Sequence, residues 1–405
     1  MTPADDPPRW LCPRCRTRVV GHDAVRCRVD GWRLVRDRTG SRVGRFTLEG
    51  FLGVGANGSV WRAADEVGHP VAVKLLLPRV PAEAQRFDRG ARLAQGLDHP
   101  HVARTFGVGR LTSEEGELLY LDMELLDGET LAARLTHQPR LSAEASARLV
   151  VQALHALEHV HARGIVHRDL KPSNLFLERE PADNVKILDF GIAKPTAPTG
   201  LTGRTEGSVV GPFLPDAPDE AVEAEAGGAG LEHEEVTGQH KICGTPEYMA
   251  PEQIVGARPD ARSDLYALGV VLHKALTGQL PFRGRTRAEL YQQHLQAAPP
   301  PLPPDVEAPP ALAAVVARAL AKAPDDRFPS ARAMREALAA AVGLPSPRLA
   351  PTPDAERPPP LPARAVDPRV DALPPRTRSR RRALAIGFFV ASAIALAAAV
   401  VMRLG

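Results

Sequence analysis

The chain has 405 residues, of which 44% are hydrophobic and 24% charged, as in a globular protein with a real core. Its formal net charge is only +3, and nucleic acid is not an expected partner. Four cysteines are too few for a disulfide scaffold at this length, and residues 1–30 lack the apolar region of a secretory signal. We therefore expect the folded part in a reducing cytoplasm.

Composition divides the chain into four regions. They are a Cys- and Arg-rich head (1–40), a long mixed body (45–342), a proline-rich and basic connector (343–382) and an apolar tail (383–402). The connector has frequent prolines and no apolar periodicity, which predicts an extended linker.

The head contains two short motifs of the same spacing. Cys12 and Cys15 form a Cys-x-x-Cys pair, and Cys27 and Asp30 repeat that spacing with an aspartate in the last place. This pattern resembles a short zinc ribbon, because Zn²⁺ takes four N, S or O ligands in a tetrahedron. We expect these four residues to bind Zn²⁺. His22 is a rival fourth ligand, and a metal-free head, or one that is redox-active through its first two cysteines, is the alternative.

A glycine-rich segment opens the body. Gly53, Gly55 and Gly58 follow a G-x-G-x-x-G pattern between two strand-like runs, and glycines there let a backbone approach phosphate oxygens. The chain continues as a strand after the last glycine, whereas a dinucleotide-binding turn would open a helix. Lys74 is a lone charge inside the β-branched run 71–75, and beside the glycine loop it is expected to contact the ligand.

Further motifs follow in a fixed order. They are His167-Arg168-Asp169-Leu170-Lys171-Pro172-Ser173-Asn174, then Val185–Gly191 with Asp189-Phe190-Gly191, then Gly244–Glu252, Asp264 and Arg327. Together with the glycine loop they closely resemble the eukaryotic-type serine/threonine protein kinases of bacteria, over Arg45 to Val342. The resemblance implies a two-lobed α+β fold, with a small β-rich lobe, a larger helical lobe and ATP between them.

The same resemblance assigns roles to individual residues. It implies that Asp169, Lys171 and Lys74 are catalytic, that Asn174 and Asp189 hold Mg²⁺, and that proteins are phosphorylated on Ser or Thr. The residues that it implies for ATP binding are Leu52, Gly53, Gly55, Gly58, Val60, Ala72, Lys74, Met123, Glu124 and Leu126. Glu252 with Arg327, and Asp264, resemble structural elements of the family.

One departure from the family pattern concerns the partner of Lys74. Active kinases place a glutamate nine residues before the His of a His-Pro pair, and here that position is Gly90. Glu83 lies about two turns away on the same helical face, and Asp88 points elsewhere on an ideal helix. Lowered activity, a displaced carboxylate, or a nucleotide-binding pseudokinase that acts as a membrane signalling scaffold would each account for the glycine.

A second departure is the length of the activation segment. Asp189 to Glu252 spans 64 residues, and its excess, 195–239, is rich in Gly, Pro and acidic residues and is predicted to be disordered. Candidate sites of autophosphorylation in or beside it are Thr199, Thr202, Thr205, Ser208 and Thr237. Arg168 resembles the arginine that clasps a phosphorylated loop in the family. A solvated insertion without a regulatory role is the alternative.

The tail, 383–402, has twenty residues without a charge, which is the length of a membrane-spanning helix. Arginines precede it directly, so the positive-inside tendency predicts a single-pass protein of the cell inner (plasma) membrane with its kinase domain in the cytoplasm. A buried C-terminal core helix is the alternative.

Overall fold

The computed structural model describes residues 8–21, 25–55, 58–78, 80–113, 116–190 and 245–344. The chain divides into two units, Met1–Ser346 and Pro347–Gly405, and the described residues all belong to the first. This division does not separate the head from the body, so the boundary predicted between them stays a prediction. The predicted insertion and tail lie outside the described residues, among which no helix is both long and apolar enough to cross a bilayer.

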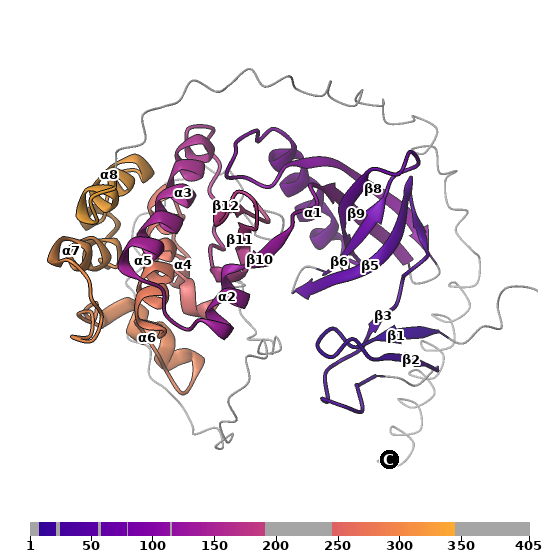
Figure 1. Ribbon diagram of the computed structural model, residues 1–405, viewed down its shortest axis with the longest axis horizontal. Helices are drawn as coiled ribbons and strands as arrows, with labels where there is room; N and C mark the ends of the chain where they lie inside the picture. The colour runs from indigo at the N-terminus through magenta and orange to yellow at the C-terminus, as the bar shows by residue number, and fades with distance from the viewer. Residues whose placement is uncertain are drawn as a thin grey trace, which may run out of the picture. The chain divides into compact units, whose positions relative to one another are not determined.

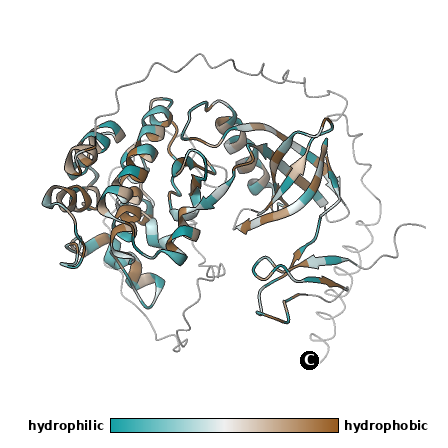
Figure 2. Cartoon of the chain, viewed as in Figure 1, coloured by the Kyte–Doolittle hydropathy of each residue, from teal (hydrophilic) through white to brown (hydrophobic). Residues whose placement is uncertain are grey.

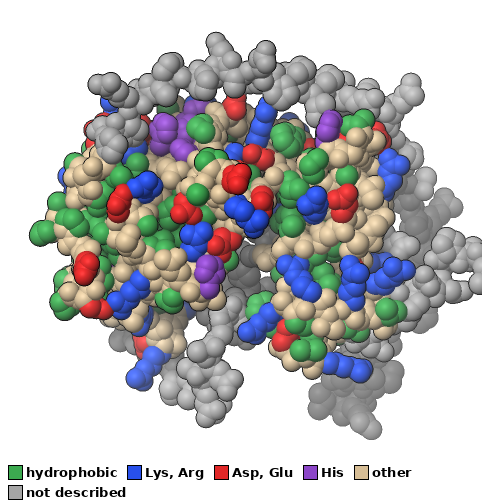
Figure 3. Space-filling view, viewed as in Figure 1, with side chains coloured by type: hydrophobic (Ala, Val, Ile, Leu, Met, Phe, Trp, Pro, Cys, Tyr) green, Lys and Arg blue, Asp and Glu red, His purple; other side chains and the backbone are tan. Residues whose placement is uncertain are grey.

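The head is a small antiparallel sheet of order β2-β1-β3 (Figure 1). Its strands are β1 (Arg9–Leu11), β2 (Arg18–Val20) and β3 (Val35–Arg36). Its core consists of Cys12, Cys27 and Leu34, with three partly buried residues around them, Trp10, Val19 and Trp32. Basic side chains gather over these strands on the face shown in Figure 3, and in the head they are all arginines.

A six-stranded sheet of order β4-β5-β6-β7-β9-β8 follows, and all its neighbours are antiparallel. The strands are β4 (Arg42–Val43), β5 (Phe46–Gly55), β6 (Gly58–Ala64), β7 (Pro70–Leu76), β8 (Thr105–Ser113) and β9 (Gly116–Met123). Buried and exposed residues alternate at the start of β5, and hydropathy varies along the strands accordingly (Figure 2). Helix α1 (Pro81–Gln95) packs Phe87 and Ala91 against Leu119 and Leu121 of β9.

The rest of the described chain is mostly helical. Its helices are α2 (Leu131–His137), α3 (Ala143–His161), α4 (Pro251–Ile254), α5 (Ala261–Thr277), α6 (Arg287–Gln296), α7 (Pro310–Ala319) and α8 (Ala331–Ala341). A small sheet of order β10-β11-β12 is formed by β10 (Gly128–Thr130), β11 (Leu175–Glu178) and β12 (Asn184–Ile187). Short 3-10 turns cover Pro172–Asn174, Pro246–Tyr248 and Pro324–Asp326.

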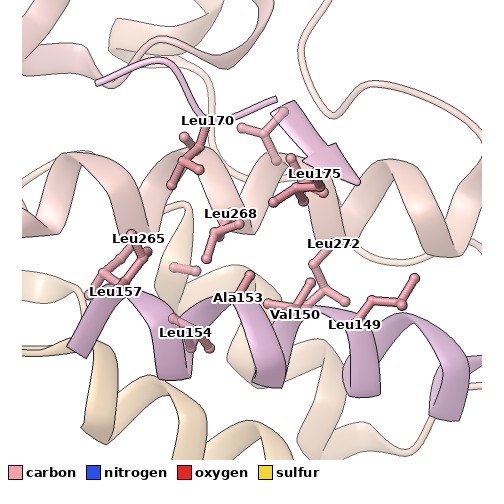
Figure 4. Packing of buried hydrophobic residues seen from close by; sticks show 14 of the residues in the cluster. Leu149, Val150, Ala153, Leu154, Leu157, Leu170, Leu175, Leu265, Leu268 and Leu272 are labelled. Atoms are coloured by element: carbon pink, nitrogen blue, oxygen red, sulfur yellow. The ribbon is translucent and has the colours of Figure 1, made fainter. Parts of the chain in front are cut away.

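Helices α3 and α5 form the centre of this region, and both are apolar on more than one face. Figure 4 shows Leu154 and Leu157 of α3 packed beside Leu265 and Leu268 of α5. Nearly every residue of α5 is buried, which is the pattern of a helix enclosed by neighbours rather than of a surface helix. The predicted order, a small antiparallel sheet with one helix and then a helical region, is therefore what the structure has.

Candidate active site

The glycine-rich hairpin joins β5 to β6 at the pair Gly55 and Gly58. Gly58 has φ 113°, and a Cβ there would lie 1.9 Å from the carbonyl oxygen of Leu75, so only glycine fits. A Cβ at Gly53 or Gly55 would instead meet no heavy atom within 4 Å. Open space therefore lies beside these two glycines, and a phosphate group can approach their backbone there.

Lys74 points from the middle of β7 to a residue that the sequence did not suggest as its partner. Its side chain is 4% exposed, and its Nζ lies 2.6 Å from Oδ1 of Asp189. Gly90 is buried in α1 without a carboxylate, and Asp88 pairs with Arg110 instead. The carboxylate that holds Lys74 is thus one of the two predicted Mg²⁺ ligands, 115 residues away in the chain.

Asp169, Lys171 and Thr245 form one hydrogen-bonded group. The Lys171 Nζ lies 3.1 Å from Asp169 Oδ2 and donates to the Thr245 hydroxyl at 2.8 Å. That hydroxyl donates in turn to Asp169 Oδ1 at 3.2 Å. The carboxylate therefore has a fixed orientation, and the described part of the predicted activation segment closes onto it through Thr245.

Asn174 connects this group to Asp189. Its Nδ2 donates to the backbone carbonyl of Asp169 at 2.7 Å, so the amide presents its oxygen on the other side. Its own carbonyl accepts from Leu188 N at 2.9 Å, which places Asn174 beside the residue before Asp189. Amide and carboxylate oxygens are the hard ligands that Mg²⁺ prefers, so the types of these two residues fit this ion.

The segment that carries Asp169 is fixed by a buried carboxylate on α5. Asp264 is 0% exposed and accepts from the backbone N–H groups of His167 and Arg168, each at 2.8 Å. Its Oδ2 also lies 2.8 Å from His161 Nε2. Burial alone would raise the pKa of Asp264, but the hydrogen bond from His161 and those from the backbone outweigh it and lower the pKa. The predicted backbone-clamp arrangement of Asp264 is present.

Several residues predicted to bind ATP lie in the six-stranded sheet and directly after its strand β9. Met123 ends β9 and is the register partner of Ala72 on β7, while Val60 of β6 pairs with Lys74. Glu124 follows, donates its N–H to the Arg104 carbonyl at 2.9 Å and accepts from Lys186 Nζ at 2.7 Å.

Two further residues were predicted to bind ATP, Leu52 and Leu126. Leu52 is 42% exposed, directly before the glycine-rich hairpin. Leu126 is partly buried after β9.

The predicted pair of Glu252 and Arg327 is also present. Both carboxylate oxygens accept from the guanidinium at 2.8 Å, and the Arg327 side chain is 0% exposed. Its other donors reach the carbonyls of Ala321, Arg262 and Lys322, so the buried charge is fully hydrogen-bonded. This pair belongs to the framework of the helical region rather than to the site.

In the head, the structure brings together the four predicted zinc ligands. The ligand atoms of Cys12, Cys15, Cys27 and Asp30 all lie within 4.8 Å of one another. Backbone N–H groups point at two sulfurs, from Cys15 to Cys12 Sγ at 3.5 Å and from Val29 to Cys27 Sγ at 3.4 Å. Such donors stabilise thiolates, so this set fits Zn²⁺. His22 lies outside the described residues.

The two cysteines of the first motif differ in acidity. Burial raises the pKa of the Cys12 thiol to about 11, and its Sγ lies 3.3 Å from both carboxylate oxygens of Asp30. Hydrogen bonding with Thr17 lowers the pKa of Cys15. A metal ion would have to displace the proton from Cys12, because the ligand of zinc is the thiolate.

Comparison with known proteins agrees with this geometry. The model of the protein kinase domain family matches residues 46–210 and 227–338. The chain is 38% identical over 339 residues to the serine/threonine-protein kinase Pkn1 of Myxococcus xanthus, which covers 82% of this chain and 41% of the relative. It is 35% identical over 316 residues to the serine/threonine-protein kinase PknA of Mycobacterium tuberculosis, and this match covers 76% of this chain and 64% of PknA. The chain thus spans about half of the length of such relatives.

A solved structure supports the fold alone. The kinase domain of PknI from Mycobacterium tuberculosis has a TM-score of 0.51 with 24% identity, and the match covers 74% of this chain and 97% of that domain. With the family match, this confirms the predicted kinase fold for the body of the chain.

Proposed function

The chain belongs to the protein kinase family, and from this premise we propose that it is a serine/threonine protein kinase that transfers the γ-phosphoryl group of ATP to protein hydroxyls. The observation that carries the proposal is that Asn174 links the group of Asp169, Lys171 and Thr245 to Leu188, the residue before Asp189, which pairs with Lys74. Phosphoryl transfer needs positioned charges more than covalent chemistry, and these side chains supply both signs of charge.

In this proposal each side chain has one task. Asp169 accepts a hydrogen bond from the incoming hydroxyl and orients it toward the phosphorus, and Lys171 offsets the charge on the transferred group. Lys74 binds the α- and β-phosphates beneath the glycine-rich hairpin. Asn174 and Asp189 would hold Mg²⁺, whose chemistry is to neutralise charge on the phosphate oxygens.

The test is phosphotransfer from labelled ATP to a generic protein substrate by the full chain. Asp169→Asn should lower the rate by about 10²–10⁴-fold while binding of a non-hydrolysable ATP analogue persists, because only the orienting carboxylate is lost. Mass spectrometry of the same reactions tests autophosphorylation, and sites among the candidate Thr and Ser residues should be modified in the wild type but not in the variant.

A second candidate function is an ATP-binding pseudokinase that acts as a membrane signalling scaffold. The observation in its favour is Gly90, which supplies no carboxylate for Lys74, whose partner is Asp189 instead. Analogue binding without phosphotransfer in the wild type would support this candidate and contradict the kinase proposal.

We also propose that the head binds one Zn²⁺ through Cys12, Cys15, Cys27 and Asp30, supported by the approach of their ligand atoms. Metal analysis of the purified protein should give about one zinc per chain, and Cys27→Ser should lower that ratio. A metal-free wild type after purification in zinc would contradict the site.

Membrane attachment through 383–402 is a separate proposal, supported by the uncharged length of that segment. The full chain should sediment with membranes and resist extraction by high salt, whereas a chain that ends at residue 382 should be released. A full chain that salt extracts completely would contradict it.

A further inference from the structure

One side chain of the head reaches the strand that carries the glycine-rich hairpin. The Arg16 guanidinium donates to the carbonyl of Phe51 at 2.8 Å and to that of Leu52 at 3.1 Å. It also lies over the ring of Phe51, 4.7 Å from its centroid. These two residues directly precede Gly53, so Arg16 binds β5 where the hairpin begins.

The backbone at Arg16 adopts a left-handed conformation, which is strained for any residue with a side chain. In each head motif, the backbone N–H of the residue that follows the motif donates to the carbonyl of the motif's first cysteine. These bonds run from Arg16 N to Cys12 O and from Gly31 N to Cys27 O, each at 3.0 Å. Both residues have positive φ, 63° for Arg16 and 72° for Gly31. Glycine adopts this conformation freely, whereas an L side chain is strained in it, so the arginine needs a reason to be there.

The metal-ligand motif itself determines where Arg16 points. Arg16 directly follows Cys15, and its N–H closes the turn that begins at Cys12. Backbone hydrogen bonds hold the turn itself, from Arg16 N to Cys12 O at 3.0 Å and from Cys12 N to Thr17 O at 2.9 Å. Between the two cysteine motifs, by contrast, Cys15 Sγ and Cys27 Sγ make only a weak sulfur contact at 3.5 Å. A metal ion bound by all four ligands would join the two motifs firmly, and with them the turn that ends at Arg16.

A second attachment lies at the other end of β5. Gly40 N donates to Leu48 O at 2.7 Å, and Leu48 N donates to Ser41 O at 3.0 Å. This segment leads from β3 of the head into β4, so the chain itself ties the head to the start of β5. The head therefore contacts β5 at two points. The backbone bonds of Gly40 and Ser41 hold the start of the strand, and Arg16 binds the end that leads into the hairpin.

We propose that metal occupancy of the head controls ATP binding, with Arg16 as the positioning residue that links the cysteine cluster to the glycine-rich hairpin. Phe51 transmits the contact into the sheet, because its ring packs edge-on against the buried Trp61, 5.2 Å away. With a metal ion bound by the four ligands, Arg16 holds the carbonyls of Phe51 and Leu52, and the hairpin keeps its place over the phosphates. Loss of the metal releases Arg16 and loosens the hairpin. The inference rests on the zinc site proposed above.

The experiment uses the full chain and three measurements: zinc content, the Kd of a non-hydrolysable ATP analogue, and hydrogen exchange over 46–55. Arg16→Gly suits the positive φ and should leave zinc content unchanged. It should raise the analogue Kd by about threefold to tenfold and speed exchange over β5, because it removes two hydrogen bonds and a ring contact. The KM for ATP should rise with kcat unchanged. Arg28→Gly removes an exposed arginine of the second motif and should change none of these.

Removal of the metal separates the outcomes. A chelator should raise the Kd of the wild type by the same factor as Arg16→Gly and leave the Kd of that variant unchanged. An Arg16→Gly chain with wild-type Kd, or one that still responds to the chelator, overturns the link through Arg16 while the zinc site stands. A wild type that binds no zinc overturns the site and the switch together, and the Asp169→Asn comparison still tests the kinase proposal by itself.

Discussion

The two halves of the candidate active site are held in different ways. The segment of Asp169 is fixed from below by Asp264, a buried carboxylate that accepts from two backbone N–H groups and from His161. Lys74 has a partner of another kind, because Asp189 is also a predicted Mg²⁺ ligand. Asp264 has no predicted role in ligand binding. Asp189, by contrast, would be needed by Mg²⁺, and Lys74 by the phosphates, so the ligand would compete with the pair that these two residues form.

The difference indicates where the site is preorganised. Asp264 accepts only from protein groups, so it should hold the Asp169 segment in the same position with or without ligand. Such preorganisation favours catalysis. A lysine paired with a metal ligand has to exchange partners when the ligand enters. Gly90 has no carboxylate, so it supplies no further partner for Lys74 during that exchange.

The largest effect is expected from breaking the fixed half. Asp264→Ala removes the buried acceptor of three hydrogen bonds and should lower the free energy of unfolding by about 3–5 kcal/mol, with loss of phosphotransfer. Thermal or denaturant unfolding measures the first, and the kinase assay the second. Asp264→Asn keeps the size and one acceptor and should lose less. Wild-type stability and rate in the alanine variant would show that the segment is held by other contacts.

A smaller effect is expected at the edge of that half. Thr245→Val removes the hydroxyl between Lys171 and Asp169 and should lower kcat by about tenfold to a hundredfold, because both charged groups lose a hydrogen bond. Thr245→Ser keeps the hydroxyl and should stay within a few-fold of wild type. An equal loss in both variants would place the cause in packing rather than in hydrogen bonding.

The other half can be strengthened. Gly90→Glu restores a carboxylate on α1 at the position that the family uses, and phosphotransfer should rise by about threefold to tenfold if the missing pair limits the rate. Gln85→Glu adds the same charge at an exposed position of the same helix and should leave the rate unchanged. An unchanged or lower rate for Gly90→Glu would show that pairing with Asp189 is enough.

Away from the site, the contact between α3 and the segment before β8 should respond to acid. His99, before β8, packs against His155 and His159 of α3 with ring centroids 4.7 and 5.2 Å apart, and a group of histidines is visible beside α3 in Figure 3. Burial, and then repulsion from neighbouring histidines, lowers the pKa of His99 to about 3. The pKa values of His101, His155 and His159 are lowered too, mainly by burial.

These directions fix the sign of the pH effect. The unfolded histidine takes a proton near pH 6.5, whereas the folded one takes it only near 3, so stability falls as the pH drops below 6.5. His99 is partly buried, and solvent screens part of the effect, so we expect its share of the loss at pH 5 to be only about 1 kcal/mol. The charged groups around the four rings are Arg163, Asp98, Glu158, Arg335 and Lys186. His99→Gln should flatten the pH dependence of unfolding; an unchanged slope would assign it to other groups.

The sequence was sufficient for features that depend on residues close together in the chain. The glycine-rich hairpin, the Asp169 motif and the two cysteine motifs are local patterns, and their residue types follow from backbone conformation or from ligand chemistry. The resemblance to protein kinases, built on such motifs, predicted the two-lobed fold that the family match and the PknI comparison support. The roles of the individual site residues stay predictions for the experiments above.

Other features were decided by packing between distant segments. The sequence pointed out that Gly90 leaves Lys74 without its usual partner, but only the fold brings Asp189, 115 residues away, to its Nζ. In the same way Arg16 lies 35 residues from the carbonyl that it binds, and no spacing rule relates the two. Local sequence patterns predict the backbone conformation and the ligand chemistry of one segment. Contacts between distant segments depend instead on how the buried surfaces of the whole chain pack together.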